Sequence, residues 1–311
     1  MCAMPHRLTN RARVALAVAA SIVPAAVLAA VLVGYDTYTR ERERILRDTT
    51  GTARALIAGV DDKLEEVQAV LSVLGGSPML QAGDFARFHA RAAVAAKQLG
   101  LVNIVLTDSA GPQRLNTFVP FGSPLPQTTH PTLVGVARDG KPAMTDVFRA
   151  QVSKRWLVGV GVPVQVKGER YSLNAGLPAE RLQQVLMRQR LPADWIAAVF
   201  DRSGNIAART HAPERFVGGK GSPELVKRIA EIDEGVIYSQ TLEGTPVVSV
   251  FSRSPMSGWT VAIGIPQAEL LHAAWNSMAR VAIIAFLLMG TALLLAVWIA
   301  ARLWPGDRRA G

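Results

Sequence analysis

The chain is 311 residues long, 50% of its residues are hydrophobic, and its formal net charge is +10. Its single cysteine, Cys2, excludes an intramolecular disulfide, so the folded part must rely on its hydrophobic core. The basic residues form no stripe with interleaved aromatic side chains, which argues against a nucleic-acid-binding protein and leaves the charge as a solvated basic surface.

Two long apolar runs are predicted to be transmembrane helices. They cover residues 14–34 and 281–301, and neither contains a charged residue. Each is long enough to cross a hydrocarbon core of about 30 Å as a helix. A cleaved signal peptide is the alternative for the first run, but this run is longer than the ~7–15 apolar residues of a usual signal peptide. We therefore expect an uncleaved anchor.

The charges beside these runs predict the orientation of the chain. The tail at 1–13 carries arginines and no acidic residue, and the tail at 302–311 is also net basic. Because basic residues stay on the cytoplasmic side of a membrane, we expect both tails to be cytoplasmic and the segment between the runs to be periplasmic. Small residues recur four apart in both runs, which permits close helix packing and leads us to expect a homodimer in the lipid bilayer.

Residues 35–78 are predicted to form a long stalk helix. Apolar residues recur at spacings of three and four from Ala53 to Leu74, and charged residues fill the other faces. The Gly75–Pro78 segment then breaks the helix. The apolar stripe either packs on the chain's own domain or pairs with a second copy of the chain, and different segments can serve each purpose.

A second helix and several strands are predicted after the stalk. Asp84 can cap the helix, and Gly100 can end it. Residues 103–118 have the pattern of a hairpin, and a loop rich in proline, glycine and threonine follows at 120–131. Further strands are expected at 144–150, 156–166 and 171–176.

The sequence contains an internal repeat of about 90 residues. Residues 102–117 and 196–211 both consist of an apolar strand, an aspartate, two residues, a glycine and a second strand. Their aspartates, Asp108 and Asp201, are 93 positions apart. A repeat of this length indicates a duplicated domain, because the repeats of solenoids are shorter.

The second copy has its own helix and strands. Ser222 is expected to cap a helix that begins at Pro223. A hairpin is expected at 236–251 and a last strand at 259–265. Antiparallel hairpins with short helices between them predict an α+β fold with two sheets in tandem.

In this order the pieces resemble a double Cache (dCache) extracytoplasmic sensor. The resemblance rests on the stalk, the D-x-x-G hairpins at Asp108 and Asp201, the KPAMTDVF segment before VGVGVPV, and the closing SRSPMSGWTVAIGIP. It implies two tandem PAS-like antiparallel-sheet units on a long N-terminal stalk helix, flanked by two transmembrane helices. It also implies that a small molecule binds in the membrane-distal unit.

The resemblance also implies the domain boundaries. We expect a cytoplasmic tail at 1–13, transmembrane helices at 14–34 and 281–301, a stalk helix at 35–78, a membrane-distal PAS-like unit at 79–190, a membrane-proximal PAS-like unit at 191–270, a connecting helix at 271–280 and a second cytoplasmic tail at 302–311.

We find no sequence signature of catalysis or metal binding. The five histidines are scattered and lack the close spacing of metal ligands. The Gly218–Ser222 segment resembles part of a phosphate-binding loop, but Lys220 is followed by glycine instead of serine or threonine. Gly159 and Gly161 lack the third glycine of a dinucleotide-binding motif and are expected where a backbone or a ligand packs closely. We therefore expect no enzyme activity, no metal and no cofactor in this chain.

The last strand of the distal unit has a polar face. Ser172, Asn174 and Gly176 share one side of it, and Leu173 and Ala175 share the other. The dCache resemblance implies that the polar side lines the ligand pocket.

Five residues are predicted to bind the ligand, namely Phe121, Asp146, Phe148, Trp156 and Asn174. The first lies in the long loop, which would cover the pocket, and the others lie on or beside the predicted strands. The alternative for Phe148 and Trp156 is the hydrophobic core, and the alternative for Asp146 is a cap at the end of a strand.

The sequence departs from dCache domains that bind amino acids or amines. Many of these carry an Arg-x-Trp-Tyr cluster before the strand that begins here at Met144, and acidic residues on the pocket strands. The stretch here is HPTLVGVARDG, without that cluster, and Ala150 and Gly176 stand about where the acids would be. An ammonium ligand is therefore not expected. An organic anion is favoured by the nearby basic residues Arg149, Lys154 and Arg155.

Together these features predict a bacterial inner-membrane sensor with a periplasmic ligand-binding domain. Because only RLWPGDRRAG follows the second run, we expect a signal-transduction input module without its own output domain, which signals through a separate cytoplasmic or membrane partner. One alternative is the truncated input half of a sensor histidine kinase, as in two-component systems, or of a diguanylate cyclase. Another is a membrane-anchored enzyme or scaffold without a sensory role.

Overall fold

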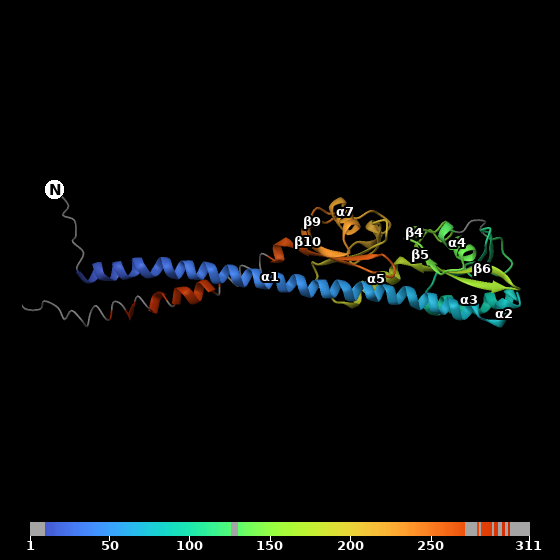
Figure 1. Ribbon diagram of the computed structural model, residues 1–311, viewed down its shortest axis with the longest axis horizontal. Coiled ribbons are helices and arrows are strands. Elements are labelled where there is room, and N and C mark those ends of the chain that lie inside the picture. Colours follow the sequence, from blue (N-terminus) through green and yellow to red (C-terminus); the bar gives the residue numbers. More distant parts are fainter. Residues whose placement is uncertain are drawn as a thin grey trace, which may run out of the picture. The chain divides into compact units, whose positions relative to one another are not determined.

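The computed structural model divides the chain into two compact units, Met1–Ile45 with Ala268–Gly311 and Leu46–Gln267 (Figure 1). The residues described are 10–125, 130–270, 279, 281–287, 289–291, 294, 295 and 298, without the side chains of 10–23, 25 and 26. All strands among these residues lie in the second unit.

The first unit contains the beginning of helix α1 (Asn10–Gly75). Within the part of the chain that the structure describes, no helix combines the length and the apolar character needed to cross a membrane. The predicted span at 281–301 is only partly described. The predicted connecting helix at 271–280 and the tail at 302–311 lie outside the described residues, apart from residue 279.

In the second unit, α1 is the support on which both sheets pack. Its apolar stripe is buried, as the spacing of these residues predicts. The buried residues are Ala53, Leu56, Ile57, Val60, Leu64, Val67, Leu71 and Leu74. The stripe therefore packs on the chain's own domain over this range. The helix ends at Gly75, three residues before the predicted end of the stalk, and Ser77 caps the short helix α2 (Pro78–Gln81).

The second compact unit contains both PAS-like units, called the distal and proximal units below. The distal unit is a sheet with helices on both faces. Its other elements are α3 (Phe85–Leu99), β1 (Asn103–Asp108), β2 (Gln113–Asn116), α4 (Pro131–Asp139), β3 (Ala143–Met144), β4 (Phe148–Arg149), β5 (Trp156–Val166), β6 (Glu169–Pro178) and α5 (Ala179–Arg188). The antiparallel strands have the order β2-β1-β6-β5-β3, with β4 also pairing with β5. Asp84 and Gly100 cap α3 as predicted.

Two features of this unit differ from the prediction. The strand expected at 144–150 is two short strands, β3 and β4, because the Val147 N–H between them donates to Asp201 Oδ2 instead of to β5. Helix α4 was not predicted. His130 caps it, Pro131 stands in its first turn, and Gly140 ends it in the left-handed conformation with φ of 66°.

The proximal unit repeats this plan with one strand fewer. It consists of β7 (Ile196–Phe200), β8 (Ile206–Arg209), α6 (Pro213–Phe216), α7 (Pro223–Glu231), β9 (Glu234–Gln240), β10 (Pro246–Arg253) and β11 (Thr260–Pro266). Its strand order, β8-β7-β11-β10-β9, matches that of the distal sheet element by element. Ser222 occupies the N-cap position of α7, but its side chain makes no capping hydrogen bond, so that detail of the prediction was wrong.

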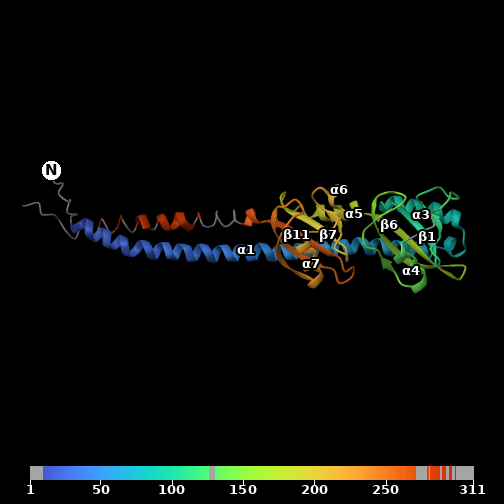
Figure 2. The same ribbon diagram turned by 90° about the horizontal axis from the view of Figure 1, so that it is seen from above.

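The two sheets follow one another along α1 (Figures 1 and 2). Figure 1 shows α4 and α7 on the side of their sheets that is turned away from α1. Alternate residues of β7 divide between two hydrophobic clusters: Ala197 and Val199 join the main core with α1, and Ala198 and Phe200 join a smaller core under α7. The prediction of an α+β fold with a long N-terminal helix and two antiparallel sheets is confirmed.

Candidate ligand-binding site

The distal unit contains a cavity of about 480 Å³ beside helix α4. The sheet strands β1, β2, β4, β5 and β6, helix α4 and the loop after β4 contribute its wall. The lining residues are Val102, Asn103, Val105, Gln113, Asn116, Phe118, His130, Pro131, Leu133, Phe148, Arg149, Ala150, Gln151, Val152, Ser153, Leu157, Gly159, Asn174, Ala175 and Gly176.

Glycines form part of the floor of the cavity. Gly159 of β5 and Gly176 of β6 lie opposite each other in the sheet. A Cβ atom on Gly159 would come within 2.8 Å of Leu133 Cδ1, and one on Gly176 within 2.7 Å of Asn103 Oδ1. These two positions therefore leave room for α4 and for the amide side chains, as expected for Gly159 from the sequence.

Amide side chains make up much of the polar wall. Asn103 Nδ2 donates to Asn116 Oδ1 at 3.1 Å, and Asn116 Nδ2 donates to Gln113 Oε1 at 2.9 Å. On the neighbouring strand, Asn174 Nδ2 donates to Thr107 Oγ1 at 3.2 Å, and Asn174 Oδ1 accepts from Ser172 Oγ at 2.5 Å. These bonds fix the orientation of the amides, so the polar wall is organised before any ligand binds.

Two further polar residues of the wall lie in β4 and in the loop that follows it. The Ser153 Oγ is buried and has no hydrogen-bond partner among the described residues. A buried hydroxyl without a partner is costly, and a ligand that bonds to it would remove that cost. Arg149 is the only charged residue of the described wall apart from the titratable His130, and the wall contains no aspartate or glutamate. The Arg149 side chain is exposed, and its Nε donates to the Lys154 carbonyl at 3.1 Å.

His130 links the wall of the cavity to the helix that covers it. Its Nδ1 accepts a hydrogen bond from the Thr132 backbone N–H at 3.3 Å, and its ring packs at 5.0 Å from the ring of Phe148. Because Nδ1 accepts, the proton of the neutral ring lies on Nε2. Burial lowers the pKa of His130 below its ordinary value, and the charge of Asp146 opposes only part of this shift.

Two of the five predicted ligand residues line the cavity. Phe148 and Asn174 are in its wall, whereas Phe121, Trp156 and Asp146 are not. Phe121 is 53% exposed and lies edge-on to the ring of His89 at 5.7 Å. Trp156 lies against Gly218 of the proximal unit so closely that a Cβ atom there would overlap the indole.

Sequence reasoning missed Asn103, Asn116, His130 and Ser153 of the wall. The first two face the cavity through the cross-strand register, in which Asn103 lies opposite Gly176 and Val105 lies opposite Asn116. Val105 of β1 lies opposite the predicted ligand residue Asn174, and alternation along β1 places Asn103 on the same face as Val105. This pattern would have identified Asn103 from the sequence. No local sequence signal marks His130 or Ser153.

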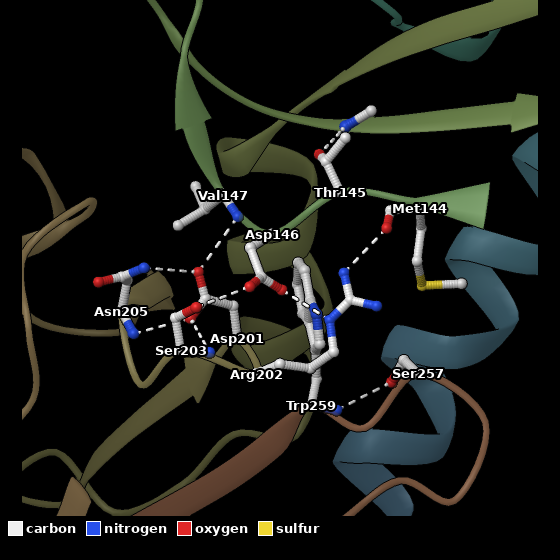
Figure 3. Close-up of polar contacts among 11 residues, drawn as sticks. Met144, Thr145, Asp146, Val147, Asp201, Arg202, Ser203, Asn205, Ser257 and Trp259 are labelled. Atoms are coloured by element: carbon white, nitrogen blue, oxygen red, sulfur yellow. Dashed lines mark hydrogen bonds and ion pairs between the residues drawn. The ribbon is translucent and has the colours of Figure 1, made fainter. Parts of the chain in front are cut away.

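Asp146 instead joins the distal unit to the proximal unit (Figure 3). Arg202 Nε donates to Asp146 Oδ1 at 2.8 Å, and Ser203 Oγ donates to Asp146 Oδ2 at 2.9 Å. Arg202 Nη2 also donates to the Met144 carbonyl at 2.8 Å. The carboxylate is thus not part of the described cavity wall. It is the distal half of a bonded junction between the two units.

The next residue completes this junction. The Val147 backbone N–H donates to Asp201 Oδ2 at 3.2 Å, and Asp201 is only 3% exposed. Its other acceptor positions are taken by the Ser203 and Asn205 backbone N–H groups, at 2.9 and 2.8 Å, and by Asn205 Nδ2 at 2.9 Å. Burial raises the pKa of Asp201 in spite of these bonds, and the nearby Asp146 charge adds to the rise.

The repeat shows what is specific to this turn. In the distal unit, Asp108 also holds its own D-x-x-G turn, with Oδ1 accepting from the Ala110 and Gly111 N–H groups at 2.9 and 3.0 Å. Its other oxygen pairs with Arg114 at the surface. Asp201 uses the same turn geometry but directs its second oxygen to the backbone of the other unit.

The proximal unit is tied in turn to α1. Ser257 Oγ donates to Asp61 Oδ1 at 2.7 Å, and Arg54 donates through Nε and Nη2 to both oxygens of Glu234 at 2.6 and 2.5 Å. Arg54 is exposed, so its pair with Glu234 adds little to stability. Bonded contacts therefore run from the cavity wall at Phe148 through Asp146 to the proximal unit, and from that unit to the stalk.

Neither a protein-family model nor a curated protein sequence matches the chain. Among the described residues, no group of three potential metal ligands comes together.

Solved structures share the fold. The extracellular domain of rpHK1S-Z16, described as a histidine kinase, aligns with a TM-score of 0.57 at 12% identity, over 74% of this chain and 97% of that chain. The ligand-binding domain of the Campylobacter jejuni chemoreceptor Tlp3, in complex with L-valine, aligns with a TM-score of 0.56 at 14% identity, over 76% and 97%. The ligand-binding domain of Mlp24 with asparagine aligns with a TM-score of 0.51 at 15% identity, over 78% and 98%.

The fold is therefore that of the extracellular sensor domains of histidine kinases and chemoreceptors. This confirms the dCache resemblance at the level of the fold. At these identities, what the chain binds must be argued from its own cavity.

We predict that protonation of His130 destabilises the folded chain. As the pH falls below about 6.5, the unfolded chain takes up a proton at this histidine that the folded chain still excludes, so stability falls until the lowered folded pKa is reached. Thermal unfolding of the wild type and of His130→Asn at pH about 7.5 and about 5.0 measures this, because asparagine can cap α4 without titrating. Lowering the pH should reduce the melting temperature of the wild type more than that of the variant. If the difference in melting temperature between the two proteins did not change with pH, the predicted effect of His130 protonation would be contradicted.

Proposed function

We propose that the chain is a membrane-anchored extracytoplasmic sensor that binds a small organic anion in the cavity of its distal unit. The observation that carries this proposal is the cavity itself. Its volume of about 480 Å³ lies within the ~300–1,000 Å³ of small-molecule sites. Its wall combines apolar surface with oriented amides and an unpartnered hydroxyl, as ligand pockets do.

Structures of the same fold support a sensory role. The Tlp3 and Mlp24 domains are described as ligand-binding domains, with L-valine and with asparagine respectively. Both ligands are small zwitterions, with a carboxylate and an ammonium group, and are of a size that the cavity in this chain can hold.

The charges in the wall favour an anion over an ammonium ligand. A buried ammonium group needs a carboxylate or several acceptors nearby to replace its water shell. The described wall offers Arg149 and no acidic side chain, and Ala150 and Gly176 stand in the wall where acids would otherwise contribute. An arginine guanidinium binds carboxylates well, through two parallel hydrogen bonds.

We predict that carboxylates stabilise the purified full chain and that the matching amines do not. A ligand that binds only the folded state raises the melting temperature in a concentration-dependent way. Isovalerate, valine and isobutylamine share one branched carbon skeleton and differ only in their charged groups, so they form one set of a wider carboxylate and amine panel. Thermal-shift measurements should find stabilisation by members of the carboxylate series. Stabilisation by amines alone would contradict the proposal.

Two variants test whether the effect arises in the cavity. Arg149→Gln should weaken carboxylate binding at least about ten-fold, as expected for the loss of a charged hydrogen bond. Arg91→Gln is the matched control, because Arg91 is exposed on α3 and is not in the cavity wall. If the two variants weakened carboxylate binding equally, the carboxylate would bind outside this cavity.

The junction supports the transmission of a signal from this cavity. Phe148 and Arg149 line the cavity, and the two residues before them bond to the proximal unit. A ligand that binds one arrangement of this segment more tightly than another shifts the balance between them. We propose that the proximal unit and α1 carry this shift to a cytoplasmic or membrane signalling partner, and that the chain itself acts by binding and not by catalysis.

We also propose that the apolar runs at 14–34 and 281–301 anchor the chain in the bacterial inner membrane, with both termini cytoplasmic and the sensor domain periplasmic. The support is their sequence, uncharged over about 20 residues and flanked by arginine-rich tails. Small residues spaced four apart in both runs support a homodimer. Cross-linking in membranes that yields only the monomer mass would contradict the dimer.

Cys2 allows a direct test of the orientation. It is the only cysteine and lies in the predicted cytoplasmic tail, so a membrane-impermeant maleimide should label it only after the cells are lysed. In a Cys2→Ser background, Ser72→Cys places the thiol at an exposed position of α1 in the sensor domain, and it should react without lysis once the outer membrane is permeabilised. Labelling of Cys2 under those same conditions would contradict the proposed orientation.

A further inference from the structure

The proximal unit contains a second cavity in the position equivalent to the distal one. It is small, about 50 Å³, and lies on the side of its sheet that carries α7. The two sheets have the same strand order, and they have the same register: Asn103 lies opposite Gly176, and Ile196 lies opposite Gly264. Strand positions in one wall therefore correspond to strand positions in the other.

Among the described residues, many wall positions of the distal cavity have a counterpart in the wall of the proximal cavity. The equivalent pairs are Asn103 and Ile196, Val105 and Ala198, Gln113 and Ile206, Asn116 and Arg209, Leu157 and Val247, Gly159 and Ser249, Asn174 and Ala262, and Gly176 and Gly264. The duplication has thus preserved the place of the cavity and changed its lining.

The new lining is more aliphatic, keeps small polar residues such as Ser239 and Ser249, and has one charged side chain. Aliphatic side chains replace the distal amides at Asn103, Gln113 and Asn174, and the equivalent of Asn116 is Arg209. The Arg209 side chain is only 4% exposed, and its guanidinium lies 4.2 Å above the ring of Phe216. A buried cation at the wall of an apolar cavity requires an anionic partner.

That partner comes from the turn of the β9–β10 hairpin. Arg209 Nη1 and Nη2 donate to the two oxygens of Glu243, each at 2.7 Å. The guanidinium holds the pKa of Glu243 at about 2, so the carboxylate stays charged. The rest of this turn is largely exposed, and residues 240–242 line the cavity. Glu243 therefore reaches from a surface turn to the buried Arg209 and occupies the place that a carboxylate ligand would take.

Other groups around the cavity also favour an anion. Gly221 and Ser222, at the N-terminus of α7, line it, and the N-terminus of a helix attracts negative charge. The Ser222 side chain makes no capping hydrogen bond. The segment that resembles part of a phosphate loop thus contributes the edge of this cavity, although its sequence does not fit that motif.

We propose that the proximal cavity is a second binding site, specific for a short-chain aliphatic monocarboxylate that takes the place of Glu243 on Arg209. The volume of about 50 Å³ holds about three to five water-sized groups, which suits a propionate-sized molecule. The aliphatic side chains of Ile196, Ile206 and Val247 accept the alkyl chain. Arg209 is the only cationic side chain in the described wall, so the second charge of a dicarboxylate would remain unpaired. Displacement of Glu243 frees the hairpin turn, so occupancy of the site changes the edge of the proximal sheet.

The test is propionate binding to the full chain in detergent, in an Arg149→Gln background that weakens the distal site. Glu243→Gln removes the competing charge and keeps the size of the side chain. We expect it to lower the propionate Kd at least ten-fold relative to the same chain with Glu243, as measured by calorimetry. Adding Arg209→Met to Glu243→Gln should abolish this gain, and n-propylamine should not bind either chain. Equal propionate affinity with and without Arg209 would overturn the proposal.

A second arm does not depend on the folding of the Glu243 variant. In the same background with Glu243 intact, propionate at higher concentration should raise the melting temperature, succinate should not, and Arg209→Met should remove the propionate effect. A propionate effect that survives Arg209→Met would overturn the proposal. The chains compared here differ only in residues of the proximal unit. These measurements can therefore be interpreted even if the distal site binds no ligand.

Discussion

The segment between β3 and β4 is bonded on both sides, and the connection between the two sheets depends on it. Thr145 ties the segment to the cavity floor, since its Oγ1 accepts from the Gly159 N–H at 2.9 Å and its N–H donates to the Gly159 carbonyl at 2.9 Å. The next two residues bond to Arg202, Ser203 and Asp201 of the proximal unit (Figure 3). The pairing with β5 is interrupted at Val147, because the Val147 N–H bonds to Asp201 of the proximal unit.

The strength of this connection suits a signalling role. Hydrogen bonds to charged groups contribute about 1.5–3 kcal/mol each, and the coupling between two sites in a protein is typically about 1–3 kcal/mol. The Arg202 pair with Asp146 is partly exposed and is the weaker part, whereas the Asp201 acceptor is buried. Loss of the Val147 contact would leave a buried carboxylate oxygen with one donor fewer, which is costly.

The sequence predicted the repeating features well and the contacts between units poorly. Alternation along β6 placed Asn174 and Gly176 on one face, and the D-x-x-G pattern located both turns, because these depend on local geometry. Asp146 and Trp156 were placed in the pocket because their strand neighbours are there. Their true contacts, with Arg202 and with Gly218, are with residues more than 50 positions away, and no local pattern reports them. Asn116 required the cross-strand register, and helix α4 was hidden in a segment without strong periodicity.

The central claim is that the cavity wall and the proximal turn form one energetic unit, and a double-mutant cycle tests it most directly. Phe148→Ala changes the cavity wall and Arg202→Ala changes the proximal side of the junction, and the free energy of unfolding is measured for both single variants and the double variant. We expect a coupling of at least about 0.5 kcal/mol between these two residues. The control pair Phe148→Ala and Arg228→Ala, in which Arg228 is a partly exposed residue of α7, should have additive effects. Effects of Phe148→Ala and Arg202→Ala that add to within about 0.3 kcal/mol would contradict it.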